Sequence, residues 1–271
     1  MKRVSFILGG GLVSLVVLAA LVSTFWTPHP TDVISIANRF QPPSASHWLG
    51  TDQLGRDLLS LLMEGAQSSV IVAFLSVGLG GSVGAALGLL AAARGGMLEE
   101  LVMRCADLAF AFPALLFAIM LAAIYGPSLT NAVLAIAFIN VPVFARLGRA
   151  AANQIWVRDY VTAARAMGLS TFRITWRHVG PNVAAILVVQ ITIEFAIAIL
   201  AEAALSYLGL GVQPPIPSWG RMLSEAQTLL FIAPQLAIWP GVCIVIAVLG
   251  FNLLGDGLRD ATDPRLRTMR R

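Results

Sequence analysis

Few side chains in this sequence have the spacing that enzyme chemistry needs. Lys2 is the only lysine, so the chain has no glycine-rich loop ending in Gly-Lys-Ser/Thr and is not a self-contained P-loop ATPase. The three histidines, His29, His47 and His178, lie far apart and have no metal-site spacing, which disfavours a zinc hydrolase. We therefore expect no catalytic residue, no metal site and no cofactor on this chain.

The other reactive side chains fall in or beside apolar runs. Cys105 and Cys243 have no paired spacing, and we expect buried free thiols rather than a disulfide. Gln190, Glu194 and Glu202 lie within one long apolar run, where a carboxylate is costly unless it faces other helices or water. Two roles stay open for these three residues: lining a polar path, or being protonated or hydrogen-bonded across the interface with a second subunit.

The composition excludes a soluble globule. Of the 271 residues, 58% are hydrophobic and 12% are charged, whereas an ordinary soluble domain has about 25% charged residues. The mean hydropathy is +0.82. Several long apolar runs carry almost no charge, and a bilayer core about 30 Å thick needs roughly 20 such residues per helix. The sequence thus predicts an all-α, multi-pass membrane protein, and its net charge of +4 indicates membrane topology rather than nucleic-acid binding.

Six apolar runs are candidate membrane-spanning helices. The first run follows Met-Lys-Arg like a secretory signal, but its apolar core is too long, it has no convincing cleavage site, and it ends in the aromatic pair Phe25 and Trp26. We expect it to be a retained helix. The six predicted spans are residues 5–26, 68–93, 108–124, 129–145, 183–207 and 229–254.

Glycines and prolines inside these runs predict how the helices pack. Gly80, Gly84 and Gly88 recur every four residues, so they line one helical face and allow a neighbouring backbone to approach closely. Four prolines fall inside the predicted spans, where each removes a backbone hydrogen bond and kinks the helix. These are Pro113, Pro142, Pro234 and Pro240.

The basic residues predict the orientation. With both termini in the cytoplasm, fifteen of the eighteen Lys and Arg residues fall in cytoplasmic segments, and only Arg39, Arg56 and Arg221 lie outside. This bias is the one that cytoplasmic loops show in general. The cytoplasmic set is Lys2, Arg3, Arg94, Arg104, Arg146, Arg149, Arg158, Arg165, Arg173, Arg177, Arg259, Arg265, Arg267, Arg270 and Arg271.

The cytoplasmic loop of residues 153–180 has the pattern of two short helices. We expect Asp159 to cap the first helix and Gly168 to end it in the left-handed conformation, with Ser170 capping the second. Such helices suit docking into a groove of a partner protein, but an amphipathic hairpin lying on anionic lipid fits equally well. The predicted apolar faces are Tyr160, Ala163, Ala164 and Met167 in the first helix, and Phe172, Trp176 and Val179 in the second.

The same loop resembles the EAA loop of permeases of type I ABC importers. That pattern, Glu-Ala-Ala-x-x-x-Gly, is matched by Ala163, Ala164 and Gly168, with Thr162 in place of the glutamate and Pro181 at the later proline. The wider string from position 159 to 168 is similar to the form found in the dipeptide, oligopeptide and nickel branch of the family.

Three further segments resemble the same branch, in the order and at the topological positions that the family uses. The first precedes the second span, the second follows the fifth span, and the third ends the chain. They are His47-Trp48-Leu49-Gly50-Thr51-Asp52-Gln53-Leu54-Gly55-Arg56-Asp57; Ser206-Tyr207-Leu208-Gly209-Leu210-Gly211 with Pro214-Pro215-Ile216-Pro217-Ser218-Trp219-Gly220; and Phe251-Asn252-Leu253-Leu254-Gly255-Asp256-Gly257-Leu258-Arg259-Asp260 with Asp263-Pro264-Arg265.

The resemblance implies a six-helix, type I importer fold in the bacterial inner membrane, similar to the C-type subunit of a permease heterodimer. It implies four kinds of contact: a second homologous permease, two ATPase subunits that bind ATP and Mg, an external solute-binding protein, and membrane lipid. Short peptides are the leading substrate class. The expected domains are a first helix (1–27), an external loop with a short amphipathic element (28–67), a five-helix core with the coupling loop 153–180 (68–256), and a cytoplasmic tail (257–271).

The resemblance also implies roles for particular residues. Contact with the ATPases is expected at Asp159, Ala163, Ala164, Arg165, Met167 and Gly168. Contact with the binding protein is expected at Asp52, Arg56, Asp57 and Trp219, although capping of a helix end by Thr51 and Asp52 is an alternative for that external segment. Gln190, Glu194 and Glu202 are candidates for the translocation path.

Two other functions stay open. Within the family, the cargo could be nickel or another metal chelate, because selectivity lies largely in the separate binding protein. Outside it, a secondary transporter driven by an ion gradient would use intramembrane carboxylates as proton or sodium sites and often has an internal repeat. The sequence has the carboxylates but no convincing repeat.

Overall fold

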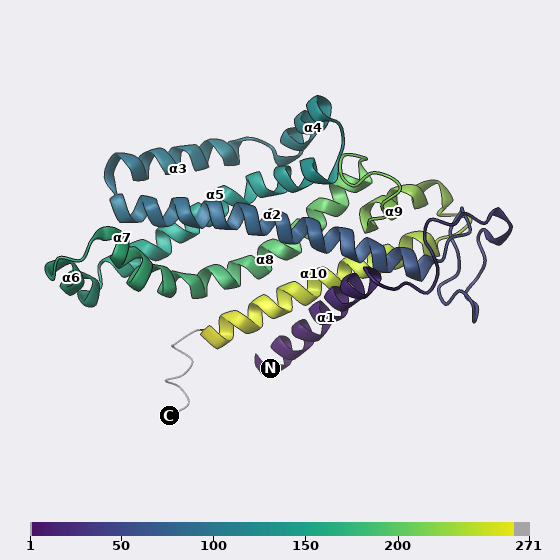
Figure 1. Cartoon of the computed structure of the whole chain (residues 1–271), viewed down its shortest axis with the longest axis horizontal. Helices are drawn as coiled ribbons and strands as arrows, with labels where there is room; N and C mark the ends of the chain where they lie inside the picture. Colours follow the sequence, from purple (N-terminus) through teal and green to yellow (C-terminus); the bar gives the residue numbers. More distant parts are fainter. Residues whose placement is uncertain (1, 263–271) are drawn as a thin grey trace.

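The computed structural model describes residues 2–262, and the regular elements in that range are helices (Figure 1). Three short turns of other helix types, η1 (Ile36–Asn38), η2 (Thr175–Val179) and η3 (Gln227–Leu229), connect or extend them. The α-helices are α1 (Lys2–Ser23), α2 (Leu58–Arg94), α3 (Gly96–Ala111), α4 (Ala114–Tyr125), α5 (Leu129–Trp156), α6 (Asp159–Ala166), α7 (Thr171–Ile174), α8 (Gly180–Tyr207), α9 (Trp219–Ala226) and α10 (Gln235–Thr262).

Five helical stretches are long and apolar enough to cross a membrane: α1, α2, α5, the continuous stretch Thr171–Tyr207, and α10. A sixth crossing requires α3 and α4 together, which are bent by 81°. The prediction of one helix over 108–124 is therefore wrong. Pro113 lies in the break rather than inside a helix, and Phe112 before it is extended, because a proline disfavours helical backbone at the preceding residue.

The predicted glycine face of α2 is confirmed. A side chain at Gly80, Gly84 or Gly88 would collide with the backbone carbonyl oxygens of Ala137, Val141 and Ala145, respectively, all on α5. The glycines of α2 and the carbonyl groups of α5 that they meet both recur every four residues, so one face of α2 lies directly on one face of α5. Because the residue numbers of the two partners rise together, the two helices run in the same direction. Since α2 and α5 are parallel, the bent pair α3–α4 must return the chain to the side from which α2 began.

Several boundaries differ from the prediction. Helix α2 begins at Leu58, where the Asp57 side chain accepts a hydrogen bond from the Ser60 backbone amide, so the last part of the expected external loop is helical. Helix α10 begins after Pro234, which therefore lies outside it, whereas Pro142 and Pro240 are inside helices. Of the predicted tail, residues through Thr262 extend α10. Residues 263–271, with Arg265, Arg267, Arg270, Arg271 and the Asp263-Pro264-Arg265 motif, lie outside the described range.

The first helix packs along the last one. A side chain at Gly250 of α10 would meet Leu12 and Val13 of α1, and one at Gly257 would meet Phe6. The remainder of α1 exposes large aliphatic side chains, among them Leu15, Leu18 and Leu21. In a bilayer such a surface faces lipid, so α1 is a peripheral helix that packs mainly on α10 and also on α2. Figure 1 shows α1 and α10 side by side at the edge of the bundle.

The close contact of α2 with α5 predicts a sharp difference between two glycines of the same helix. Gly84→Leu places a large side chain against the α5 backbone and should destabilise the fold by about 1–3 kcal/mol or more, the usual cost of overpacking. Gly78→Leu is the matched control, because Gly78 is exposed and a side chain there meets nothing within 4 Å. Thermal unfolding of the purified protein in detergent measures both variants. Equal unfolding temperatures would contradict the proposed packing role of Gly84.

Candidate functional site

The loop between α5 and α8 folds into the two predicted short helices. Helix α6 ends at Gly168, whose φ of +82° is left-handed as predicted, and the Ser170 side chain accepts a hydrogen bond from the Arg173 amide at the start of α7. The prediction that Asp159 caps α6 is wrong. Arg158 holds the cap position without a side-chain hydrogen bond, and Asp159 is the first helical residue.

One side of this loop is anchored in a small buried cluster. Val161 and Ala164 of α6, Ile174 of α7 and Val179 of η2 are at most 2% exposed. They pack with residues Ala151 and Ala152 at the end of α5 and Val183 at the start of α8. The loop therefore forms a rigid unit with α5 and α8.

The other side of the loop presents apolar side chains to the surroundings. Val157, Met167, Phe172 and Trp176 are 74–80% exposed, and Tyr160 is 46% exposed. Exposed surface of this kind usually marks a site of interaction. We call this set, with the exposed Ala163, the outer loop face: Val157, Tyr160, Ala163, Met167, Phe172 and Trp176.

Two predictions for this loop need correction. Ala164 belongs to the buried anchor and not to the face of Tyr160, Ala163 and Met167. Val179 is likewise buried, whereas Phe172 and Trp176 are exposed, because the π-helical turn Thr175–Val179 changes the helical register between them. The Arg165 guanidinium lies 5.3 Å from the centre of the Trp156 ring, a cation–π contact within the chain.

The segment before α2 is a tight turn and not the short amphipathic element that was expected. The Asp52 carboxylate accepts hydrogen bonds from the Leu54 and Arg56 amides and pairs with the Arg56 side chain at 2.7 Å. Thr51 and Asp57 form an antiparallel bridge across the turn. Asp57, rather than Thr51 or Asp52, caps α2. Asp52 and Asp57 are therefore 4% and 2% exposed, and both shape the turn from inside.

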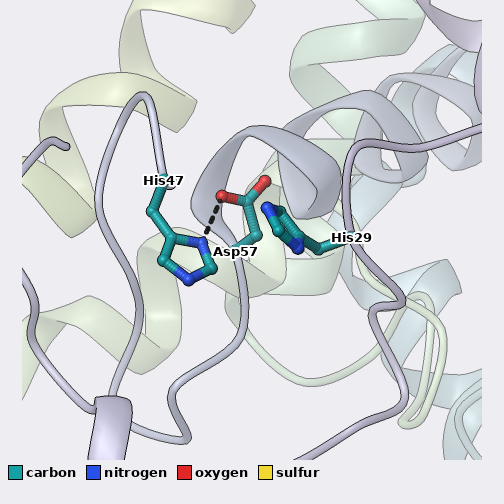
Figure 2. Close-up of side chains that lie close together, drawn as sticks. All are labelled: His29, His47 and Asp57. Carbon is teal, nitrogen blue, oxygen red and sulfur yellow. Dashed lines mark hydrogen bonds and ion pairs between the residues drawn. The ribbon is translucent and has the colours of Figure 1, made fainter. Parts of the chain in front are cut away.

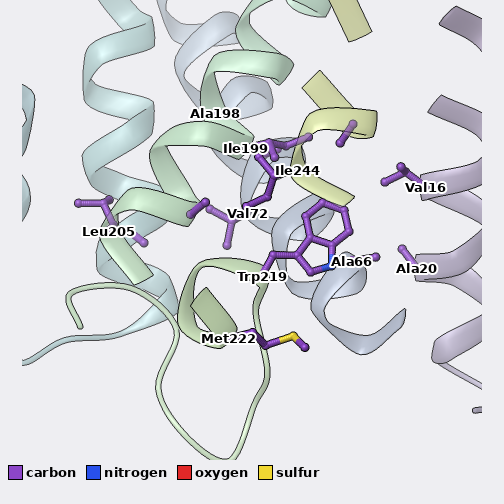
Figure 3. Packing of buried hydrophobic residues seen from close by; sticks show 14 of the residues in the cluster. Val16, Ala20, Ala66, Val72, Ala198, Ile199, Leu205, Trp219, Met222 and Ile244 are labelled. Atoms are coloured by element: carbon purple, nitrogen blue, oxygen red, sulfur yellow. The ribbon is translucent and has the colours of Figure 1, made fainter. Parts of the chain in front are cut away.

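Trp219 is also buried. It begins α9, its ring packs against Gly65 and Ala66 of α2, and its Nε1 donates a hydrogen bond to the Leu62 carbonyl oxygen at 3.0 Å (Figure 3). Together with Gly220, which lies against the α8 backbone at Ala203, it fixes α9 between α2 and α8. Trp219 was expected to contact the binding protein, and the contacts that bury it here are with α2 of this chain.

A cavity of about 280 Å³ with a mixed apolar and charged lining lies between the turn and α9. Arg56, Arg221 and Glu225 line it together with the loop of Pro214 and Pro217. Glu225 receives a hydrogen bond from Arg221 at 3.0 Å and lies 4.0 Å from Arg56. The sequence motifs before α2 and after α8 thus meet at one charged depression.

The buried carboxylate of Glu202 links three parts of the chain. It accepts hydrogen bonds from the hydroxyls of Ser69 on α2 and Ser206 on α8, both at 2.7 Å. The Ser206 hydroxyl also accepts a hydrogen bond from the Val212 amide at 3.1 Å, which holds the loop that leads to α9. Glu202 is 0% exposed, and both of its carboxylate oxygens are engaged by hydroxyl groups of this chain.

Gln190 and Glu194 form a separate pair one turn apart on α8. The Gln190 amide donates to the Glu194 carboxylate at 2.8 Å, and Glu194 is 4% exposed whereas Gln190 is partly exposed. Both carboxylates of α8 therefore point into the protein.

Of the two cysteines expected to be buried, Cys105 is exposed and Cys243 partly buried, and both are free.

The structure brings together one group that sequence spacing did not predict. His29 and His47 lie beside Asp57, with the two imidazole centres 4.5 Å apart. All three come from the segment that joins α1 to α2, whose fold was not predictable from periodicity.

Comparison with known proteins identifies relatives over nearly the whole chain. Residues 84–268 match the family described as binding-protein-dependent transport system inner membrane component. The chain is 42% identical over 262 residues to the dipeptide transport system permease protein DppC of Alkalihalophilus pseudofirmus, covering 97% of this chain and 86% of that protein. It is 41% identical over 259 residues to the glutathione transport system permease protein GsiD of Pectobacterium atrosepticum, covering 94% and 86%.

A third relative, the di/tripeptide transport system permease protein DppC of Pseudomonas aeruginosa, is 44% identical over 266 residues, covering 95% of this chain and 88% of that protein. Among solved structures, an inward-facing MetNI methionine ABC transporter is similar with a TM-score of 0.62 and 21% identity, over 75% of this chain and 97% of that chain. This similarity concerns the fold.

The Glu202 contacts predict a measurable coupling between α2 and α8. Glu202→Ala leaves the two serine hydroxyls without their acceptor and should cost about 1–3 kcal/mol of stability, whereas Glu202→Gln retains an acceptor oxygen and should cost less. A double-mutant cycle with Ser69→Ala measures the coupling by thermal unfolding. The double variant Ser69→Ala/Glu202→Ala should lose less than the sum of the single losses; additive losses would show that the hydrogen bond does not contribute.

Proposed function

Because this chain belongs to the family of binding-protein-dependent transport system inner membrane components, we propose that it is one of two permease subunits of an ATP-driven importer of short peptides. The second subunit is a homologous permease, and two ATPase chains bind ATP and Mg. An external solute-binding protein delivers the cargo. Membership in this family excludes the alternative of a secondary transporter. The chain is a permease subunit without catalytic residues of its own.

The observation that carries this proposal is the outer loop face. Its exposed apolar side chains surround the small Ala163, and such a surface fits a groove of an ATPase partner better than it fits water. Ala163 and Met167 make the contact, Gly168 sets the bend between α6 and α7, and the buried Ala164 supports the contact from behind. Arg165 holds α6 against Trp156, and Asp159 stabilises the first turn of α6 through the helix dipole.

The buried side of the same loop gives the mechanism of coupling. Val161 and Ala164 fasten α6 to the end of α5, and the helical stretch Thr171–Tyr207 is continuous from α7 into α8. A displacement of the loop by the ATPases therefore moves α5 and α8 as rigid elements. Rigid-body movement of this kind is the usual way in which packed helices switch between two states. The movement would alternate the permease between inward and outward openings.

The orientation follows from the basic residues. The outer loop face and the arginines around it lie at the cytoplasmic end, and α9 with the turn before α2 lies at the external end. Figure 1 places α6 and α7 at one end of the bundle, and α9 and the start of α2 toward the other.

The external depression between the turn and α9 is where we place the binding protein. Arg56 and Glu225 are accessible there, so they are the contact residues. The buried residues Asp52, Asp57 and Trp219 act indirectly, because they hold the turn and α9 in position. The charged lining suits a polar loop of the binding protein.

The translocation path lies beside α8, between this subunit and its partner. Gln190 is partly exposed and holds Glu194 by a hydrogen bond, so these two residues are the candidates for contact with cargo. Glu202 has both carboxylate oxygens engaged by Ser69 and Ser206, and we assign it to positioning the helices.

Short peptides are the proposed cargo because relatives of this chain are permeases of transport systems for dipeptides, di/tripeptides and glutathione, itself a peptide. Nickel or another metal chelate is the alternative within the family. The test is uptake by the assembled importer in proteoliposomes, with a labelled dipeptide on the outside and ATP on the inside. Unlabelled tripeptide and glutathione are then added as competitors.

The peptide proposal predicts ATP-dependent accumulation of the labelled dipeptide, reduced by unlabelled peptides and unaffected by Ni²⁺. The partner binding protein must be present in the assay. Accumulation of Ni²⁺ without accumulation of peptide would overturn the peptide proposal and leave the permease assignment intact.

The coupling proposal predicts that a charge in the outer loop face uncouples the importer. Ala163→Asp should abolish co-purification of the ATPase subunits and reduce uptake at least about 10-fold, because a buried unpaired carboxylate costs several kcal/mol at an interface. Ala261→Asp is the matched control, since Ala261 is exposed in the last turn of α10. Undiminished uptake by the Ala163→Asp variant would rule out the proposed docking face.

A further inference from the structure

The segment between α1 and α2 gathers two imidazoles and a carboxylate at the start of α2. His29 and His47 come from different parts of this segment, and Asp57 is the cap of α2. Each offers a ligand atom, and these atoms lie within 4.8 Å of one another. Figure 2 shows the two rings on either side of the Asp57 carboxylate.

Hydrogen bonds hold the three residues in place. The His47 Nδ1 lies 3.0 Å from one carboxylate oxygen of Asp57, and the other oxygen accepts from the amide and the hydroxyl of Ser60 at 2.9 and 2.8 Å. The His29 backbone amide donates to the same Ser60 hydroxyl at 3.0 Å. Ser60 therefore fixes both Asp57 and the backbone of His29.

The hydrogen bond of the His29 ring leaves one of its two nitrogens with a free lone pair. Its Nε2 lies 2.7 Å from the backbone carbonyl oxygen of Ser46, and a carbonyl oxygen only accepts hydrogen bonds, so Nε2 carries the proton and Nδ1 keeps its lone pair in the neutral ring. Metal-binding histidines characteristically donate their second ring nitrogen to a carbonyl or carboxylate in this way.

We propose that His29, His47 and Asp57 form a binding site for a divalent transition-metal ion, with Zn²⁺ as the best fit. Two imidazoles and one carboxylate are a common ligand set for such ions, and water completes the coordination. Zn–N and Zn–O bonds of about 2.0–2.2 Å place neighbouring ligands roughly 3.3 Å apart, so the side chains must close by up to about 1.5 Å. The proposal does not depend on the transported cargo.

Access and charge are compatible with a bound cation. The His47 side chain is 14% exposed and the Asp57 side chain 1% exposed, so an ion reaches the site from the histidine side. The positive end of the α2 dipole lies next to the site, and the Asp57 carboxylate offsets it. A bound ion would join both parts of the α1–α2 segment to the start of α2.

The chain allows a clean test because it has three histidines in all. The full-length protein, purified in detergent without a histidine tag and stripped of metal with a chelator, is titrated with Zn²⁺ by calorimetry. We expect one Zn²⁺ per chain. His29→Ala and His47→Ala should each weaken binding at least about 10-fold, and the double variant should remove the stoichiometric ion. His178→Ala, in the remote coupling loop, is the matched control and should bind as the unaltered chain does.

Thermal unfolding separates loss of a ligand from loss of structure. Zn²⁺ should raise the unfolding temperature of the unaltered chain and of His178→Ala, because an ion that binds the folded state stabilises it. Zn²⁺ should not change the unfolding temperature of His29→Ala/His47→Ala relative to the value that this variant has in chelator. Absence of a stoichiometric ion on the unaltered chain, or equal binding by the double variant, would overturn the proposal. If the double variant does not fold, His29→Gln alone must still show the loss.

Discussion

The direct contact between the backbones of α2 and α5 is the constraint on which the rest of the structure depends. Inside a bilayer, burying apolar side chains against each other gains little, because lipid tails are equally apolar, so helices associate through close van der Waals packing. Gly80, Gly84 and Gly88 make that packing possible over three helical turns. The start of α2 carries the external turn and the end of α5 carries the coupling loop, so this single contact fixes the two ends of the molecule relative to each other.

Helix α8 is attached to this pair by polar contacts as well as by packing. The hydrogen bond of Ser69 to Glu202 joins α2 to α8 at a fully buried position, where an unsatisfied carboxylate would be very costly. The same carboxylate reaches the loop before α9 through Ser206. Because the alternative to these bonds is an unpaired polar group in hydrocarbon, they specify one register between α2, α8 and α9 rather than simply adding stability.

The sequence predicted the features that depend on local backbone chemistry. The repeated glycines predicted the closely packed face of α2. Gly168 predicted the left-handed residue after α6, and Ser170 predicted the cap of α7. Each of these features depends on the backbone or side-chain chemistry of a single residue type. Predictions that depend on tertiary context were less successful. The 81° bend at Pro113 changes the direction of the helix axis, and the π turn that buries Val179 changes the helical face. A prediction from periodicity assumes that both stay constant along a helix. The proximity of His29 to His47 arises in an irregular segment, where no periodic pattern exists to predict it.

The structure also bears on the choice between a protein partner and lipid for the coupling loop. An amphipathic hairpin on a membrane surface lies in the plane of the interface, with its apolar face toward the acyl chains. In helix α6, which lies beyond the ends of α2 and α5 in Figure 1, the apolar residues Val161 and Ala164 instead face α5 and η2 within the chain. The apolar side chains that remain, such as Met167, therefore project from a segment already anchored to the bundle. Such a rigid, projecting surface transmits force from a protein that binds it, whereas contact with fluid lipid would transmit none.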